Sequence, residues 1–190
     1  MIPDYIVHYH YTGSPPFRNL SDLEEQERRE VIATLNDRYA RKEILREFPG
    51  WYMPQRLEAE QNLRNSFISK GGKPERKAPH YFTLGFSPLF EKLYGDKKAK
   101  QVFSVKDFSE HELCFCLNDS LWTMAESKDP KQKFNCRWFE GQVYSYAETV
   151  AILSELNVDV ENHESLQQNK IAFVEALVWS DGRIASATDR

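Results

Sequence analysis

Long apolar segments are missing from this sequence of 190 residues. Its two most apolar stretches, residues 5–11 and 171–179, fall well short of the ~20 apolar residues that a membrane-spanning helix needs. The first residues also lack a basic segment followed by an apolar one, which is the pattern of a secretory signal. We therefore expect a cytoplasmic protein that has no membrane span.

Cysteine is scarce, and positive charge is not in excess over negative charge. The three cysteines, Cys114, Cys116 and Cys136, leave one thiol unpaired in any disulfide scheme, and Cys114 and Cys116 do not have the spacing of a zinc site. We expect reduced thiols in the core. The formal net charge of −4 excludes a global field that attracts nucleic acid or anionic membranes. A polyanion would have to bind a local patch.

The composition suits one globular domain over residues 1–190, because 41% of the residues are hydrophobic and 28% are charged. Strand-like patterns occur at residues 5–12, 80–85, 101–105, 113–117 and 171–179, and helical patterns lie between them. This order predicts an α+β fold with a mixed or mostly antiparallel sheet. Residues 21–69 are expected to form an N-terminal helical insert.

Capping signals mark three helix starts. They are Ser21 with Glu24, Ser87 with Pro88, and Ser145 with Glu148. The first of these helices is expected to end before residues 49–50, and a further helix is expected over residues 55–69.

Asn118 and Asp119 predict a two-residue hairpin turn, because both residue types tolerate positive φ. The hairpin would join strands at residues 113–117 and 120–124. Residues 125–135 are polar and are expected to form a surface loop.

Glu175 is the strongest functional lead, because it is a lone acid within the apolar residues 171–179. Alternation along a strand places it on one face with Ile171, Phe173, Leu177 and Trp179. An ionised carboxylate buried without a partner costs several kcal/mol by a rough estimate, so such a residue is usually paired, protonated or part of a site. A salt bridge to a core arginine and a catalytic role both fit this pattern.

Two further features are candidates for binding. His8 and His10 share one face of the first strand, where they would bind a metal or a ligand hydroxyl, or would be satisfied histidines at the rim of the core. Residues 70–77 carry four cations against one acid, and their Gly and Pro residues exclude a regular helix. This basic loop, with Lys70, Lys73, Arg76 and Lys77, is either a phosphate-binding patch or a solvated connection.

Three segments in this order resemble the ADP-ribosyltransferase fold, nearest to its nucleic-acid-modifying toxin branch. They are the His-Tyr-Thr of residues 10–12, the His-Tyr-Phe of residues 80–82 with the Ser-Pro-Leu of residues 87–89, and the Glu-Ala-Leu-Val of residues 175–178. The matching segments cover little of the chain. In place of the short helix and glycine turn of that branch, the sequence has Pro15-Pro16 and a long charged insert.

The resemblance implies that NAD is the substrate and that Glu175 is the catalytic acid. It further implies that His10 bonds a ribose hydroxyl and that Tyr81 stacks on the nicotinamide ring. Thr12 and Arg18 would contact the ribose or amide and the pyrophosphate, respectively. Cleavage of the nicotinamide–ribose bond builds positive charge on the sugar, which a fixed carboxylate stabilises.

The acceptor of ADP-ribose is expected to be a macromolecule. Phe173 stands two residues before Glu175, where a second acid would favour arginine modification, so a nucleic acid on the basic loop is the leading candidate. An inhibitory protein is a further candidate partner.

Two other classes stay open. The first is a non-catalytic α+β interaction protein, in which Glu175 pairs with a core arginine and the charged helices bind a partner. The second is a hydrolase that holds a metal with His8, His10 and Glu175.

Overall fold

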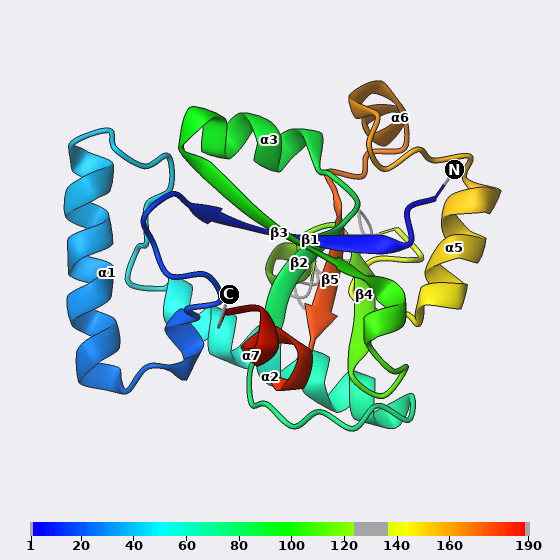
Figure 1. The fold of residues 1–190 in the computed structure, drawn as a ribbon, viewed down its shortest axis with the longest axis horizontal. Helices are drawn as coiled ribbons and strands as arrows, with labels where there is room; N and C mark the ends of the chain where they lie inside the picture. The colour runs from blue at the N-terminus through cyan, green and yellow to red at the C-terminus, as the bar shows by residue number, and fades with distance from the viewer. Residues whose placement is uncertain (1, 124–136, 189–190) are drawn as a thin grey trace.

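One five-stranded sheet organises the chain (Figure 1). The computed structural model describes residues 2–123 and 137–188. The strands are β1 (Tyr5–Tyr11), β2 (His80–Leu84), β3 (Lys98–Ser104), β4 (Leu113–Leu117) and β5 (Val174–Val178). Their order is β3-β1-β2-β5-β4, and every neighbouring pair is antiparallel. The predicted α+β class with a mostly antiparallel sheet is confirmed.

Helices occupy the connections between the strands. They are α1 (Glu25–Ala40), α2 (Tyr52–Ser69), α3 (Pro88–Tyr94), α5 (Tyr146–Glu155), α6 (His163–Gln168) and α7 (Gly182–Thr188). The expected N-terminal insert is present as α1 and α2, although α1 already ends at Ala40 and α2 begins at Tyr52 rather than near residue 55. Over the described residues, no helix combines the length and apolar character that crossing a membrane requires.

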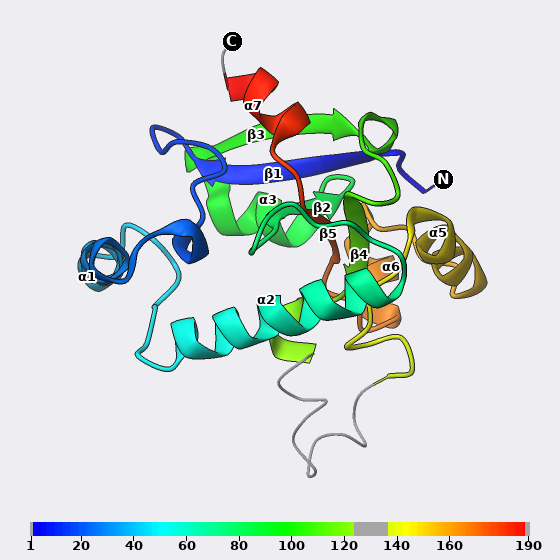
Figure 2. The same cartoon turned by 90° about the horizontal axis from the view of Figure 1, so that it is seen from below.

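Each face of the sheet carries its own core layer. Pairing of Val7 with Thr83 and of Tyr81 with Leu177 places these side chains on one face, which α2 covers and which we call the α2 face. Figure 2 shows α2 running along this side of the sheet and α7 lying on the other. The α2 face packs against one apolar cluster of α2, which consists of Ala59, Leu63 and Phe67. The opposite face holds the larger core, which includes Ile6, Phe82, Phe115, Leu153 of α5 and Ile184 of α7.

The sheet is divided between β1 and β2. These strands pair at only two positions, whereas β1 and β3 pair at seven. Beyond Val7, the chain segment after β1 enters the gap: the Phe17 N–H donates to Nε2 of His8, and the Asn19 side chain donates to the carbonyl of Pro79. The connecting segment therefore bonds to β1 through a backbone group and to the residue before β2 through a side chain.

Two of the three predicted helix caps are correct. Ser145 and Glu148 form the capping box of α5, and the Ser87 hydroxyl caps α3. The capping box at Ser21 and Glu24 is wrong, because the Ser21 hydroxyl donates to Glu60 of α2 instead. A tertiary partner has replaced the local one.

The predicted hairpin at Asn118 and Asp119 is also wrong. Residues 120–123 are helical, and the Asp119 carboxylate accepts hydrogen bonds from the backbone N–H groups of Leu121 and Trp122. Asp119 is thus the cap of a helical turn that follows β4.

The thiols of Cys114 and Cys116 are buried and free. Cys136 and the expected loop at residues 125–135 lie outside the described residues.

Candidate active site

Glu175 lies on β5, an interior strand of the sheet. It pairs with Thr83 of β2 on one side and Cys116 of β4 on the other, and only 6% of its surface is exposed. The side chain is on the α2 face with Leu177 and Trp179, as its sequence pattern predicts. Ile171 does not share that face, because β5 begins only at Val174 and Ile171 packs in the opposite core.

The helical turn after β4 provides the hydrogen bond to this acid. The Ser120 N–H donates to Oε2 of Glu175 over 3.2 Å. Burial, together with the negative charge of Asp119, raises the pKa of Glu175 to about 8, although the Ser120 bond and the charge of Arg56 act in the other direction. Glu175 is therefore mostly protonated at neutral pH.

A core arginine lies near Glu175 but is bonded to another acid. The Arg56 guanidinium pairs with Glu60 over 2.9 Å, and within the described parts of the chain Glu175 makes no ion pair. Arg56 also donates to the hydroxyl of Tyr52 and to the side-chain oxygen of Asn19, each over 2.7 Å. If the chain were a non-catalytic interaction protein, Glu175 was expected to pair with a core arginine. Arg56 does not form that pair, because it is bonded to Glu60.

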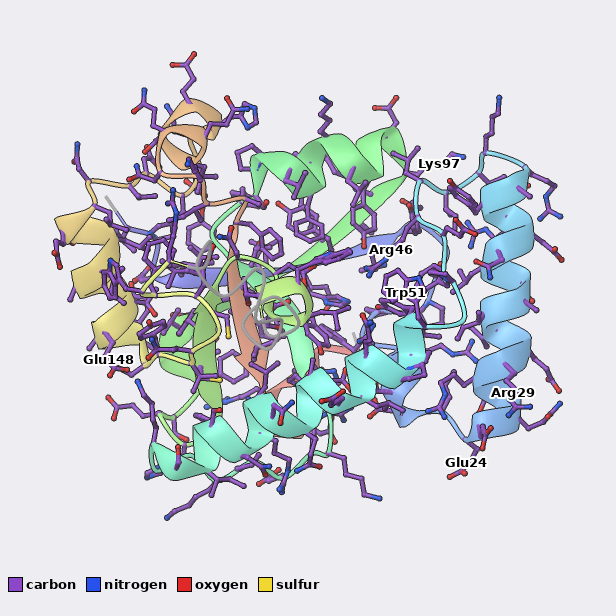
Figure 3. The ribbon with its side chains drawn as sticks, turned by 180° about the vertical axis from the view of Figure 1, so that it is seen from behind. Glu24, Arg29, Arg46, Trp51, Lys97 and Glu148 are labelled. Carbon is purple, nitrogen blue, oxygen red and sulfur yellow. The ribbon has the colours of Figure 1, made fainter. Side chains whose placement is uncertain are left out.

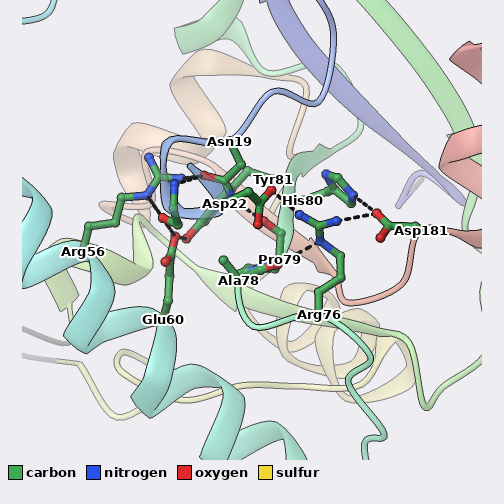
Figure 4. A network of polar contacts seen from close by, with 11 residues as sticks. Asn19, Asp22, Arg56, Glu60, Arg76, Ala78, Pro79, His80, Tyr81 and Asp181 are labelled. Carbon is green, nitrogen blue, oxygen red and sulfur yellow. Dashed lines mark hydrogen bonds and ion pairs between the residues drawn. The ribbon is translucent and has the colours of Figure 1, made fainter. Parts of the chain in front are cut away.

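Tyr81 interacts with both buried acids, Glu60 and Glu175. Its hydroxyl donates to Glu60 over 2.8 Å, and the Arg56 guanidinium lies 4.9 Å from its ring centroid (Figure 4). Burial is the main cause that raises the pKa of Tyr81, and the negative charges of Glu60 and Glu175 act in the same direction. The second oxygen of Glu60 is buried and has no hydrogen-bond partner among the described residues. The α2 face therefore holds two buried acids near one tyrosine, which bonds to Glu60 and senses the charge of Glu175.

The other residues expected to bind NAD do not lie beside Glu175. Strand alternation puts His10 on the opposite face of the sheet, where its Nδ1 lies 3.2 Å from the carbonyl of Tyr11. Thr12 follows β1 and donates its backbone N–H to Lys97. Arg18 is half exposed and pairs with Glu27 over 3.0 Å. Of the predicted set, the structure brings together Glu175 and Tyr81.

The hydrogen bonds of His8 fix its tautomer. Its Nδ1 donates to the carbonyl of Tyr81 over 2.9 Å, while Nε2 accepts from Phe17 over 3.1 Å. Burial lowers the pKa of His8 to about 4. Both ring nitrogens are therefore engaged in a neutral ring, and no cluster of three metal-ligating side chains occurs in the described residues. His8 and His10 also lie on the face opposite Glu175, so the structure separates the three ligands that the alternative metal hydrolase would need.

The basic loop is held in place by backbone hydrogen bonds. The N–H groups of Glu75 and Arg76 donate to the carbonyl of Trp179, and that of Lys73 donates to His111. Arg76 pairs with Asp22 and Asp181, and Lys70 pairs with Glu148 over 3.0 Å. Lys73 and Lys77 are exposed. Two of the four predicted cations thus already have carboxylate partners.

Sequence reasoning missed four residues of the site: Arg56, Glu60, Asp119 and Ser120. The spacing of Arg56 and Glu60, four residues apart on a helix, is a usable signal for a pair, but it does not indicate burial. Asp119 directly after a strand fits an N-cap as well as a hairpin turn, so its residue type does not distinguish the two.

These contacts define a buried acid site on the α2 face, centred on Glu175 and Tyr81. No family model, no curated protein and no solved structure matches this chain. The function therefore has to be argued from the chemistry of the site.

Proposed function

We propose that the protein is an NAD-dependent ADP-ribosyltransferase whose catalytic carboxyl is Glu175. One observation carries the proposal: a buried acid lies near Tyr81, makes no ion pair with any described residue, and has its pKa raised to about 8. Groups with such perturbed pKa values are concentrated at functional sites. NAD carries a cation on its nicotinamide ring, which would complement this acid.

The reaction requires a negative charge next to the ribose. As the bond between nicotinamide and C1 of the ribose breaks, the bonding electrons leave with neutral nicotinamide and positive charge develops on the sugar. Ionised Glu175 would stabilise that charge and then accept the proton of the incoming nucleophile as the new bond to C1 forms. A bound cation lowers the pKa of a neighbouring acid, so NAD itself would favour the ionised form.

Tyr81 is the aromatic group assigned to the nicotinamide end. The residue is half-buried, and the Arg56 guanidinium lies 4.9 Å from its ring centroid. His10, Thr12 and Arg18 have no role in this proposal, because their contacts lie elsewhere.

The test compares the wild-type protein, Glu175→Gln and Glu155→Gln with labelled NAD. Glu155 ends α5 with an exposed side chain, so its variant has the same chemical change outside the site. Nicotinamide release and label transfer to single-stranded DNA, RNA or lysate proteins are followed. We expect Glu175→Gln to lose at least about 100-fold in release, as for loss of other stabilising groups in a transition state. Release that is absent in the wild type, or equal in all three proteins, contradicts the proposal.

The pH dependence provides a second readout. The kcat/KM for NAD is expected to rise with pH through an inflection near 8, the pKa of Glu175 in the free protein. The kcat profile should have its inflection at lower pH, because bound NAD favours the ionised acid. If the pH profiles of kcat and kcat/KM have the same inflection, Glu175 is excluded as the titrating group.

Binding of a protein partner through α1 is a second candidate function. This helix has no fully buried residue, and Figure 1 shows it at the edge of the molecule, away from the sheet. The double variant Val31→Ser, Leu35→Ser replaces two apolar side chains of α1. In a pull-down, the wild-type protein should capture a partner that mass spectrometry identifies, and the double variant should not capture it. Turnover that depends on Glu175 should persist in the double variant. Equal capture by both proteins excludes α1 as the contact surface.

A further inference from the structure

Two exposed tryptophans contact each other beside the acid site. Trp51 is 47% exposed and Trp122 is 53% exposed. Their ring centroids are 6.1 Å apart, and the planes make an angle of 64°. Edge-to-face contact leaves indole faces open to solvent. A pair of large aromatic rings that is not buried in the core is typical of a binding surface.

Each indole belongs to a segment that contacts a residue of the acid site or the arginine beside it. Trp122 is in the helical turn whose Ser120 N–H donates to Glu175. Trp51 precedes Tyr52, whose hydroxyl accepts from the Arg56 that lies over the Tyr81 ring. The contact between the tryptophans therefore joins the two segments that position Glu175 and Tyr81.

Arg46 provides positive charge next to the aromatic pair. Its guanidinium lies 4.6 Å from the ring centroid of Tyr52 and 5.4 Å from that of Phe48. The side chain is exposed, and none of the ion pairs between described residues includes it. Figure 3 shows Arg46 and Trp51 near each other at the N-terminal end of α2. Arginine held flat on aromatic rings retains donors at its edge for phosphate oxygens.

We propose that Trp51, Trp122 and Arg46 form a nucleotide-binding site, in which a base stacks on the face of one indole and contacts the edge of the other, and the guanidinium binds the phosphate. Base stacking on aromatic side chains tolerates any base, since every base has a π-face. The proposal rests on the proposed function in one respect, namely that the base belongs to NAD or to a nucleic-acid acceptor next to Glu175. Both sources share the chemistry of a base linked to phosphate.

The experiment measures binding, independently of turnover. Adenosine, AMP, NAD and a 12-nucleotide single-stranded DNA are titrated into the full chain at low salt, with isothermal calorimetry and tryptophan fluorescence as readouts. The variants are Trp51→Ala, Trp122→Ala, Arg46→Gln and, as control, Trp138→Ala. Trp138 is 59% exposed and contacts Phe139, so it matches the pair in exposure. Trp51→Phe and Trp122→Phe keep an aromatic face if the alanine variants fold poorly.

Each alanine variant of the pair should weaken nucleotide binding by roughly 5- to 100-fold, the range for loss of one stacked base, and Trp138→Ala should not. The phenylalanine variants should retain most of the affinity. Arg46→Gln should weaken AMP binding and leave adenosine binding unchanged, because adenosine has no phosphate.

The ligand series distinguishes the two sources. Binding of AMP and NAD with no gain for DNA assigns the site to NAD, whereas much tighter binding of DNA assigns it to an acceptor strand, and both results support the site. Failure of every ligand to bind, or binding by the Trp51 and Trp122 alanine variants that equals binding by the wild type, overturns it. If the tryptophan variants bind nucleotides as the wild type does while turnover still depends on Glu175, the nucleotide-binding site is contradicted and the proposed function is supported. If binding depends on the tryptophans but no protein turns over NAD, the nucleotide-binding site is supported and the proposed function is contradicted.

Discussion

At Glu175, burial outweighs the favourable interactions of the ionised form. Among the described residues, the Ser120 N–H donates to the acid and Arg56 adds positive potential, but Asp119 and the apolar surroundings favour the neutral carboxyl. Glu60, on the same face, has three donors to one oxygen: Ser21, Arg56 and Tyr81. Two glutamates in one site thus differ in environment, as the acid and base of many enzymes do.

Replacement of Glu175 by Gln should change how stability depends on pH. The pKa of Glu175 is about 8 in the folded protein and near 4.5 in the unfolded chain, so between these values the native state holds a proton that the unfolded state has released. The free energy of unfolding of the wild type therefore falls as pH rises through this window. Urea unfolding should show Glu175→Gln gaining stability relative to wild type from pH 5 to pH 8. A constant difference would contradict the raised pKa, and Glu155→Gln serves as the flat control.

His8 should have the opposite dependence on pH. Its pKa is about 4 in the folded protein and 6.5 in the unfolded chain, so the unfolded state binds an additional proton between these values. The free energy of unfolding should therefore fall by about 2–3 kcal/mol as pH drops from 6.5 to 4. His8→Gln removes this contribution. The difference in unfolding free energy between the wild type and His8→Gln should therefore shrink as the pH falls toward 4. Curves that stay parallel would show that His8 is not buried in its neutral form.

At the scale of the elements, the two insert helices differ in what they contribute. α2 buries Leu63 and Phe67 against Trp179 and forms one wall of the acid site, whereas α1 buries no residue completely. Helix propensity alone gives both a similar chance to form. The packing of one face therefore gives α2 most of its stability.

Leu63→Ala should cost about 3 kcal/mol of unfolding free energy, because Leu63 is 1% exposed and its removal leaves a cavity. Ile32→Ala on α1 removes a similar number of atoms from a half-buried side chain and should lower the unfolding free energy by about 1 kcal/mol or less. Urea unfolding measures both. Equal costs would mean that α1 is packed as firmly as α2.

At the scale of the molecule, Arg76 ties distant parts of the chain together. It pairs with Asp22 before α1 and with Asp181 after β5, and the Nε2–H of His80 donates to the same Asp181 over 2.7 Å (Figure 4). The Arg76 side chain is only 12% exposed. Its location in the basic loop suggested phosphate binding, but its partners give it a structural role.

Arg76→Met should destabilise the protein by roughly 1–2 kcal/mol, a value kept small because Asp22 and Asp181 remain partly hydrated. Lys77→Met, the same change at an exposed cation of the same loop, should cost less than about 0.5 kcal/mol. Thermal and urea unfolding give the comparison. If the two variants lose equal stability, Arg76 does not link the segments.

Local signals predicted what local physics controls. Ser145 with Glu148 and Ser87 with Pro88 were correct because their partners lie within one helical turn. Ser21 was wrong because Glu60, 39 residues away, accepts its hydroxyl hydrogen. The same limit applies at Asn118 and Asp119, where residue preferences fit a hairpin turn and a helix cap equally well.

The sequence by itself determined the α+β class, the strand that carries Glu175 and the face on which that acid lies, because alternation and capping act over a few residues. Tertiary structure alone decided which groups meet there. The pairing of Val7 with Thr83 sends His10 to the opposite face, and α2 brings Arg56 and Glu60 over Tyr81. Such contacts depend on strand register and helix packing between segments tens of residues apart, and no short-range pattern encodes them.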